Sequence, residues 1–590
     1  MDEEKVTPTP AEEPVEKKAT EETAAPSAEG AAQQTAAPAK KQNVFDKFFG
    51  ITASGSSFKA EIVAGLTTFM AMVYIMIVNP SMFSNIPGLS FQAMYIATAL
   101  GAIVGTLLMS LLAKMPLAQA SGMGVNAFVV FNLVIYGGLT YANAMVFTLL
   151  DGIIFLILTV TGARKYIFKA IPDEVRKAIN VGLGLFIAFI GLQNAGVIVA
   201  NSSTLVNLAS FNVLSANFVT YASGTVGGML PAIVAILGVI AIAILEKKKV
   251  KGSILFGIIG SAVLFYIFAG FACLAGGADL VSYSFAAEDI KNVDLATISG
   301  FVSQSYATID GEQVLQVVVN SMPADLFETT FGSIPLQASH FYTNGVAAKQ
   351  IFTNISFSNP FAAFGAWGKE SAGKVFYEGF NFSGYLGIEG NTPASLVLLL
   401  VTSALSLCML DMFDTLGTLY GACSKGNLLD QEGNPLNMNK CMLSDAIATC
   451  AGAMAGTSTV TTFVESSAGV AAGGKTGFTA LITAAGFFIA MFLSPIAQLI
   501  PSAATATALI WVGVLMMSTV VNIEWTDPSV ALPAFLTIAV MAFGYEISYG
   551  IGIGIISSVI VRVCTGKVKS VSVVTWILAA FFLATFILTH

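Results

Sequence analysis

Apolar segments of about 20 residues, the length that an α-helix needs to cross a bilayer, recur along most of this chain. One set of them precedes a long polar stretch, 275–391, and a second set follows it. They lie near 59–79, 91–115, 119–136, 143–162, 175–194, 228–246, 253–274, 392–422, 440–456, 460–473, 476–500, 503–523, 529–545 and 547–564. The pattern predicts an all-α polytopic membrane protein with 14 transmembrane segments, seven in each set.

The segments also divide the chain into regions. Residues 1–44 are rich in Ala, Pro, Glu and Thr, which predicts a disordered N-terminal tail. We assign 45–274 to the first set of spans and 392–566 to the second. The last region, 567–590, contains an apolar piece at 571–589 that is either an additional span or an interfacial helix.

Basic residues in short loops predict the orientation, because such loops are retained in the cytoplasm. Lys40, Lys41 and Lys47 precede the first span, and a lysine cluster at 247–251 separates the sixth span from the seventh. These positions predict a cytoplasmic N-terminus in the plasma or inner membrane. Seven spans then place the insertion, 275–391, on the extracytoplasmic side. The second set enters from the opposite side, which predicts an inverted repeat of the kind found in many secondary transporters.

The third segment of each half is interrupted. In the first half, Leu117–Phe128 is short and broken by glycines. In the second, Thr457–Gly474 opens with β-branched residues that favour a strand and then turns to small residues that favour a close-packed helix. Glu465 lies at this change. An acidic residue at a backbone break inside the membrane predicts a binding site, because such breaks are tolerated only where they line a cavity or are buried in protein.

Other polar residues lie within apolar segments. Asp411 and Asp414 are three residues apart, so a helix places both on one face, and Thr415 lies one turn beyond Asp411. Asn126 belongs to the first interrupted segment. Burial disfavours the charged form of a carboxyl group, so several acids in one cavity imply a bound proton, a donor or a cation. A bound proton suits coupling to a proton gradient.

Two further acids, Asp151 and Asp445, are interpreted as structural hydrogen-bond partners. An isolated acid within the membrane can have that role, and Asp151 lies in the fourth span and Asp445 at the start of the ninth.

Composition narrows the class of protein. Only 11% of the residues are charged, whereas soluble domains carry about 25%. The basic residues form no patch for nucleic acid. The two histidines, His340 and His590, lie outside the apolar spans, and the six cysteines lack metal-ligand spacing, so we expect no metal, no cofactor and no enzyme activity. An ion channel is disfavoured, because rings of selectivity residues and repeated arginines are absent.

Five blocks in this order carry a family resemblance. They are AEIVAGLTTFMAMVYIMIVNP at 60–80, GMGVNAF at 122–128, DMFDTLGTLYG at 411–421, GTSTVTTFVESSAGVAAGGKTGFTA at 456–480 and SPIAQLIPSAATATALIWVG at 494–513. Across residues 45–590 the chain resembles the nucleobase–cation symporter superfamily, in its AzgA-like adenine/guanine/hypoxanthine permease branch.

This resemblance implies a core domain and a gate domain. Spans 3 and 10 would each be a short strand followed by a half-helix, with the purine between them. The acid matching Glu465 would hold the ring N–H groups of the base, and the acid matching Asp411 would contact the base or carry the proton. Residue pattern and resemblance together predict substrate binding by Glu465, Asp411, Asn126 and Thr415, and proton coupling by Asp411, Glu465 and Asp414. The resemblance also implies that the backbone around Val464 and Ser466 adds hydrogen bonds to the substrate.

The chain is therefore expected to be a purine nucleobase:proton symporter that works by alternating access. Uracil, xanthine or another small anion-like solute is the alternative cargo, and Na⁺ is the alternative coupling ion. The sequence leaves open which purine is carried and whether the protein forms a homodimer. The expected partners are the purine base and the lipid bilayer.

Overall fold

The structure is a computed structural model that describes residues 44–589 with internal gaps. The gaps are 163–170, 202–203, 212–217, 223–224, 276–279, 287–301, 310–311, 324–325, 327–329, 331–340, 344–350, 353–358 and 432. The predicted disordered tail, 1–44, therefore falls outside the described residues except for Val44.

The first half of the chain is mostly helical. Its helices are α1 (Val44–Phe49), α2 (Phe58–Met72), α3 (Ile75–Phe83), α4 (Phe91–Leu108), η1 (Met109–Ala113), α5 (Met123–Ala127), η2 (Phe128–Tyr136), α6 (Tyr141–Thr161), α8 (Asp173–Asn194), α9 (Met229–Lys247) and α10 (Ser253–Ala275). Its strands are β1 (Gln119–Ser121), β2 (Ile198–Asn201), β3 (Leu205–Leu208), β4 (Thr220–Ala222) and β5 (Thr225–Gly227).

Strands β6 (Leu280–Ala286), β7 (Val302–Ile309), β8 (Glu312–Pro323) and β9 (Phe341–Thr343) follow. The helices of the second half are α13 (Ala362–Glu370), α14 (Lys374–Tyr377), α15 (Ser383–Leu386), α16 (Pro393–Lys425), α17 (Met438–Ala455), α18 (Ser466–Ala471), α19 (Gly477–Ala490), η3 (Met491–Leu493), α20 (Ser494–Ala497), α21 (Ser502–Met517), η4 (Ser518–Asn522), α22 (Pro528–Phe543), α23 (Ile547–Cys564), η5 (Val568–Ser570) and α24 (Val573–Thr589). One further strand, β10 (Val460–Thr462), lies between α17 and α18 in the chain.

Many of these helices can cross a membrane. Within the described residues, 10 helices are long and apolar enough to do so, and three shorter apolar helices cover Met123–Tyr136, Pro528–Phe543 and Val573–Ile587. The chain is therefore a multi-pass membrane protein. Its division into 14 spans and an inverted repeat stays a prediction.

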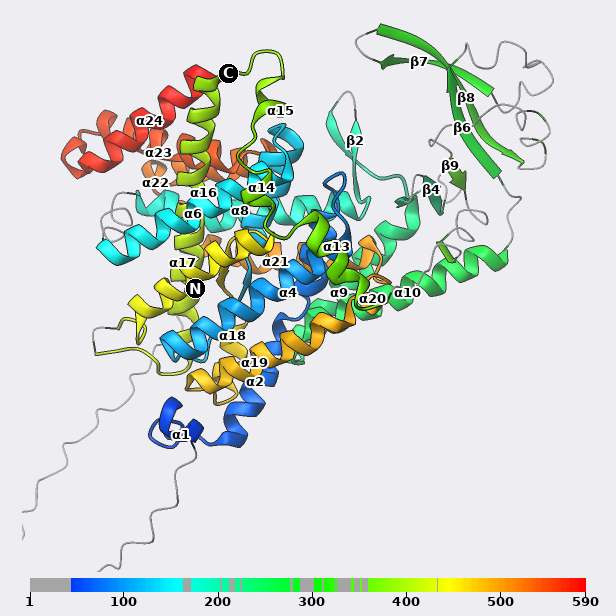
Figure 1. The fold of residues 1–590 in the computed structure, drawn as a ribbon. Coiled ribbons are helices and arrows are strands. Elements are labelled where there is room, and N and C mark those ends of the chain that lie inside the picture. The colour runs from blue at the N-terminus through cyan, green and yellow to red at the C-terminus, as the bar shows by residue number, and fades with distance from the viewer. Residues whose placement is uncertain are drawn as a thin grey trace, which may run out of the picture. The chain divides into compact units, whose positions relative to one another are not determined.

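The all-α prediction is incomplete. Six strands form one sheet in the order β5-β4-β9-β6-β8-β7, and β7 pairs with β8 in an antiparallel register from Val302↔Val319 to Ile309↔Glu312 (Figure 1). Most of this sheet belongs to the 275–391 insertion. Side chains of a strand alternate between its two faces with a period of two residues. Strands therefore do not appear as continuous apolar stretches of helix length, which are the pattern that predicts the spans.

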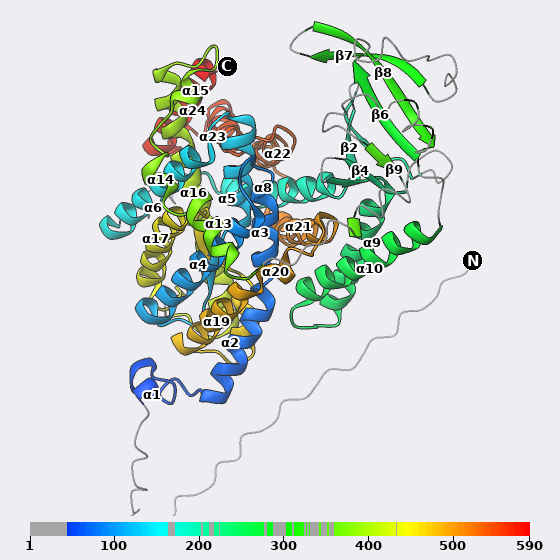
Figure 2. The ribbon, with the colours of Figure 1, turned by 45° about the vertical axis from the view of Figure 1, so that its right-hand side comes forward.

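Helix α2 packs closely against α19, and both views show the two side by side (Figures 1 and 2). A Cβ added at Gly65 of α2 would lie 2.6 Å from both Ile482 Cβ and the Thr479 carbonyl oxygen. Glu61 of α2 is fully buried and accepts hydrogen bonds at the start of α19 from the Thr476 hydroxyl at 2.9 Å and the Thr479 hydroxyl at 2.5 Å. The glutamate satisfies helix-start donors and joins two spans that are distant in sequence.

Candidate functional site

The two interrupted segments pair with each other as antiparallel strands. We call this paired region, β1 with β10, the strand crossing. In β1 and β10, Gln119 pairs with Thr462 and Ser121 with Val460. The Phe463 amide extends the ladder by donating to the Ala118 carbonyl at 3.0 Å. Helix α5 begins shortly after β1, and α18 shortly after β10. The expected order of strand and then helix is thus present in both segments, and the ladder satisfies backbone groups that lipid could not.

Glu465 is held by a tyrosine from the first span. Tyr74 lies in the break between α2 and α3, and its hydroxyl donates to Glu465 Oε1 at 2.6 Å. The Glu465 side chain is only partly buried, and the neighbouring Val464 is 46% exposed. Glu465 therefore has a fixed orientation, and neither it nor Val464 is fully buried. Sequence reasoning missed Tyr74, although a tyrosine within an apolar span signals a hydroxyl that needs a partner.

Asp414 reaches the same crossing from α16. Neighbouring residues of a strand point to opposite sides, and Thr461 and Thr462 of β10 follow this rule. The Thr461 hydroxyl donates to Asp414 Oδ2 at 3.3 Å, whereas the Thr462 hydroxyl donates to Asp445 Oδ1 at 3.4 Å. Asp414 is partly buried, so one side of β10 faces an accessible carboxyl and the other a buried one.

Asp445 of α17 holds the crossing together. Besides the Thr462 hydroxyl, it accepts a hydrogen bond from Gln119 Nε2 at 2.7 Å and one from the Thr415 hydroxyl. These donors come from β1, β10 and α16, and Asp445 is fully buried. The structure therefore gives Asp445 the hydrogen-bonding role that the sequence suggested. The Thr415 hydroxyl already donates its proton to Asp445.

Two other predicted binding residues also take part in the crossing. Asn126 Oδ1 accepts from the Ser121 hydroxyl at 2.9 Å and from the Ser458 hydroxyl. Its Nδ2 is buried without a partner among the described residues. The Ser466 hydroxyl oxygen accepts from the Ala118 amide at 3.0 Å. Asn126 thus keeps a donor for a ligand, whereas the Ser466 side chain is used to join α18 to the strand before α5.

Asp411 and Asp151 are both fully buried, unlike Glu465 and Asp414. Asp411 Oδ2 accepts from the Thr449 hydroxyl at 3.3 Å, and its Oδ1 is buried with no partner within the described part of the chain. Neither oxygen of Asp151 has a hydrogen-bond partner there. The interpretation of Asp151 as a structural hydrogen-bond partner is therefore wrong. The sequence showed an acid in an apolar span but not the neighbours that surround it.

The short helix α18 is pressed against α2. A Cβ added at Gly469 would lie 1.9 Å from Thr68 Oγ1 and 2.6 Å from the Ala64 carbonyl oxygen. We expect Gly469→Ala to displace α18 and cost about 1–3 kcal/mol, as over-packing usually does. A lower melting temperature and reduced substrate uptake would follow. Gly260→Ala is the matched control, because a Cβ there meets nothing within 4 Å; equal melting temperatures for the two variants would contradict this packing.

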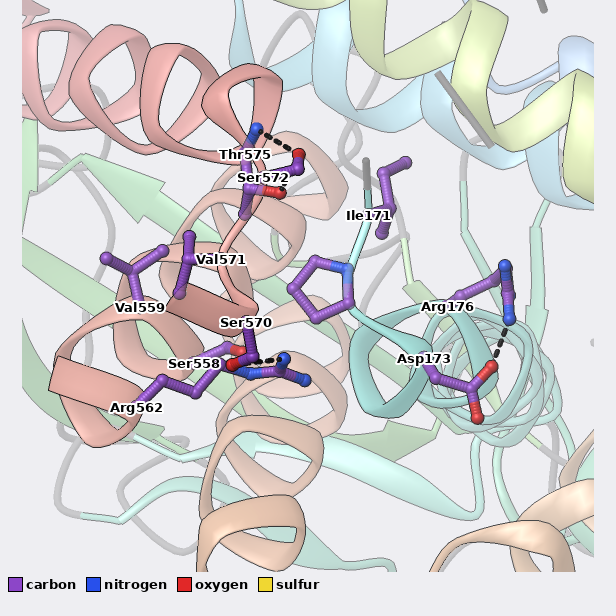
Figure 3. A pocket seen from close by; sticks show the side chains of 11 residues that line it. Ile171, Asp173, Arg176, Ser558, Val559, Arg562, Ser570, Val571, Ser572 and Thr575 are labelled. Atoms are coloured by element: carbon purple, nitrogen blue, oxygen red, sulfur yellow. Dashed lines mark hydrogen bonds and ion pairs between the residues drawn. The ribbon is translucent and has the colours of Figure 1, made fainter. Parts of the chain in front are cut away.

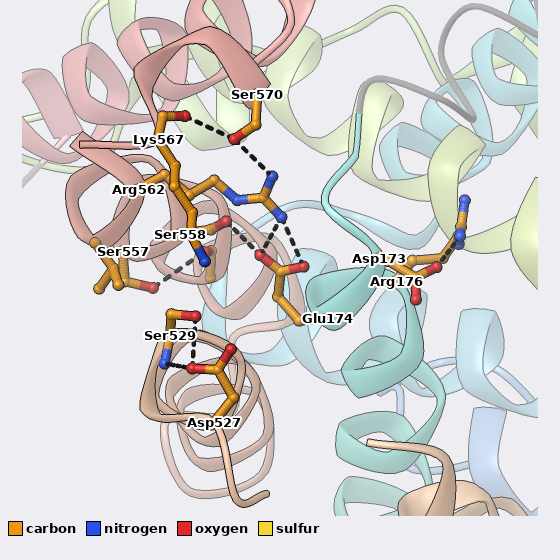
Figure 4. A network of polar contacts seen from close by, with 12 residues as sticks. Asp173, Glu174, Arg176, Asp527, Ser529, Ser557, Ser558, Arg562, Lys567 and Ser570 are labelled. Atoms are coloured by element: carbon orange, nitrogen blue, oxygen red, sulfur yellow. Dashed lines mark hydrogen bonds and ion pairs between the residues drawn. The ribbon is translucent and has the colours of Figure 1, made fainter. Parts of the chain in front are cut away.

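A cavity of about 350 Å³ lies elsewhere, between the start of α8, the end of α23 and the start of α24 (Figure 3). Of the residues that the structure describes, none of the predicted site residues lines it. Beside it, Arg562 donates to both Glu174 oxygens, at 2.9 and 3.0 Å, and the Ser558 hydroxyl donates to Oε1 at 2.6 Å (Figure 4). The charge of Arg562 is therefore already paired with Glu174, which favours a structural role for this ion pair in joining α8 to α23.

Comparison with known proteins identifies the family. The sequence pattern of the Permease family matches residues 59–274 and 375–553. The guanine/hypoxanthine permease PbuO of Bacillus subtilis is 33% identical, over 92% of this chain and 100% of its own length. PbuG, a guanine/hypoxanthine permease of the same organism, is 32% identical over 92% and 99%. The adenine permease AdeP of Escherichia coli is 30% identical over 92% and 96%.

These matches extend over most of the spans, including the two strands that cross and the helices that follow them. The relatives are covered almost completely, so the likeness concerns whole proteins and not one shared segment. This chain belongs to the Permease family of membrane transport proteins.

Proposed function

We propose that this chain is a secondary active transporter that carries purine nucleobases together with protons across the plasma or inner membrane. The observation that carries the proposal is Glu465, a partly buried acid whose carboxyl is oriented by Tyr74 beside the paired strands β1 and β10. The names of PbuO, PbuG and AdeP, which are guanine/hypoxanthine and adenine permeases, support purine bases as the cargo.

The base would bind between the two interrupted segments. Purines carry ring N–H donors, and a carboxylate that accepts them forms charge-assisted hydrogen bonds. Glu465 supplies that acceptor, and the exposed side chain of Val464 supplies apolar contact for the ring face. Asn126 Nδ2 is a buried donor without a partner among the described residues, and it suits a carbonyl or ring nitrogen of the base. Thr415 and Ser466 would shape the site through the contacts they already make.

Coupling to protons would use the buried acids. A carboxyl that loses its solvent without gaining donors is strongly favoured in its neutral form. Asp411 and Asp414 approach this condition to different degrees. Each accepts one hydroxyl hydrogen bond at 3.3 Å, and Asp411 is fully buried whereas Asp414 is only partly buried. Movement of a core that carries the strand crossing against a gate would then expose the site to each side in turn. In this proposal the chain has 14 spans in an inverted repeat and a cytoplasmic N-terminus.

Tyr74→Phe tests the orientation of Glu465. The change removes the hydroxyl that donates to the carboxyl. A hydrogen bond to a charged group contributes about 1.5–3 kcal/mol, so we expect a tenfold or larger rise in the KM for purine uptake, with no larger loss of melting temperature than in the control variant. The matched control is Tyr95→Phe, whose hydroxyl donates to the Ala490 carbonyl away from the crossing. An unchanged KM in Tyr74→Phe would show that Tyr74 does not prepare the site.

Competition for uptake distinguishes the candidate cargoes. Uptake of radiolabelled guanine or adenine into proteoliposomes would be measured against unlabelled guanine, hypoxanthine, adenine, xanthine and uracil. We expect saturable uptake that purines of the guanine, hypoxanthine or adenine type suppress. Suppression only by xanthine or uracil would favour the alternative cargo, and a flux that does not saturate would favour a channel.

A further inference from the structure

Asp151 is a buried acid to which the proposed transport cycle gives no role. It lies in α6, its side chain is 0% exposed, and neither of its oxygens has a hydrogen-bond partner among the described residues. Leaving a carboxylate charged in such surroundings costs several kcal/mol, because no donor replaces the lost water. The surroundings therefore accommodate the neutral acid, which carries a proton.

Helix α6 packs against both α16, which carries Asp411, and α17, so Asp151 and Asp411 belong to the same group of packed helices. At the neighbouring Gly152, an added Cβ would lie 2.7 Å from Cys450 Sγ and 3.1 Å from Thr449 Cγ2, so α6 and α17 are in direct contact there. The hydroxyl of that same Thr449 donates to Asp411 Oδ2, and Asp411 Oδ1 has no partner in the described part of the chain. Asp151 and Asp411 also interact electrostatically.

The charged and titratable neighbours of Asp151 do not neutralise it. The groups that interact with it electrostatically are acids and thiols, on α16 and α17; they are Asp411, Cys408, Asp445 and Cys450. The other packed elements are α14, whose Lys374 pairs with its own Glu378, and η2, which contributes Tyr136. No group of three His, Cys, Asp or Glu in the described residues could hold a metal ion. Among the described residues, Asp151 therefore has neither a hydrogen-bond donor nor an ion-pair partner.

We propose that Asp151 is a further proton-binding site, which exchanges a proton with Asp411 during the transport cycle. When Asp151 gives its proton to the Asp411 carboxylate, one O–H bond breaks and one forms, so the charge of the pair is unchanged. Movement of α6 or α16 relative to the other then decides which acid is neutral. This inference rests on the proton-coupled transport proposed above.

The test uses the full chain in proteoliposomes with radiolabelled guanine, hypoxanthine and adenine. Asp151→Asn keeps the size of the side chain but cannot bind and release the proton. We expect this variant to lose accumulation driven by a proton gradient while it keeps exchange of labelled for unlabelled base, which needs no net proton movement. Thr148→Val, on the same helix, is the matched control and keeps both activities, and Asp151→Glu restores accumulation.

Two results would overturn the proposal. One is accumulation by Asp151→Asn with the pH profile of the unaltered protein, and the other is loss of exchange as well as accumulation in a folded Asp151→Asn variant. If Asp151→Asn does not fold, Asp151→Glu decides: a shifted pH profile of accumulation supports the proposal, and an unchanged profile contradicts it. Failure of the unaltered protein to respond to a proton gradient would instead show that the proposed coupling is wrong, and it would be seen before any variant is compared.

Discussion

Replacement of Glu465 by glutamine is expected to abolish purine uptake while the protein still reaches the membrane and folds. The amide retains the size of the side chain and can still accept from the Tyr74 hydroxyl. It loses the negative charge that would hold the ring N–H groups of a base, and its NH₂ group would present a donor where the base also presents donors. Binding of the base and its transport should therefore fail together.

The measurement is initial uptake in proteoliposomes, with reconstituted amount and melting temperature determined for each sample. Glu524→Gln is the matched control, because Glu524 is exposed in the segment between η4 and α22. Uptake by Glu465→Gln at the rate of this control would show that Glu465 does not bind the substrate. Loss of folded protein in Glu465→Gln would show that the carboxyl serves the fold instead.

Asp445→Leu is expected to have the largest effect on stability. The change leaves the hydroxyls of Thr415 and Thr462 buried without their acceptor, and the Gln119 amide keeps only its contact with the Thr462 hydroxyl at 3.3 Å. Each unsatisfied buried donor costs about 1–3 kcal/mol, and together they amount to a large part of the 5–15 kcal/mol that stabilises a typical domain. The strand crossing should then fail to form, and little folded protein should be recovered from the membrane.

Asp445→Asn keeps one acceptor oxygen and should fall between this variant and the unaltered protein. Recovery of monodisperse protein and its melting temperature in detergent provide the measurement. Glu389→Leu, which removes an exposed acid before α16, controls for the change to leucine. Recovery of Asp445→Leu equal to that of Glu389→Leu would show that the Asp445 contacts do not maintain the crossing.

Local sequence was sufficient to predict most of the long apolar helices and the two interrupted segments. Apolar runs of span length, β-branched residues before Glu465 and glycines after it are each features of one short stretch. Hydrogen-bond partners that are far apart in the sequence could not be predicted in this way. Tyr74 and Glu465 are 391 residues apart in the chain, and Gln119 and Asp445 are 326 apart. Which side chains meet at such separations depends on how whole helices pack, which no local pattern records.

The same limit applies to the surroundings of the predicted site residues. Helical spacing correctly placed Asp411 and Asp414 on one helix, but the rotation of α16 about its axis decides what each one faces. As a result Asp414 contacts Thr461, Asp411 contacts Thr449, and Thr415 is engaged by Asp445. Asp151 could not be distinguished from Asp445 by sequence, because both are single acids in apolar surroundings and only their neighbours differ.

The most direct test of the account is accumulation of radiolabelled guanine, hypoxanthine and adenine in proteoliposomes, with and without an inward proton gradient. The account predicts that at least one base is concentrated inside only when the gradient is present, and that Glu465→Gln eliminates the accumulation. If none of the three bases accumulates with folded protein and an intact gradient, proton-coupled purine transport is contradicted, and the site around Glu465 must hold a different solute or work with a different ion.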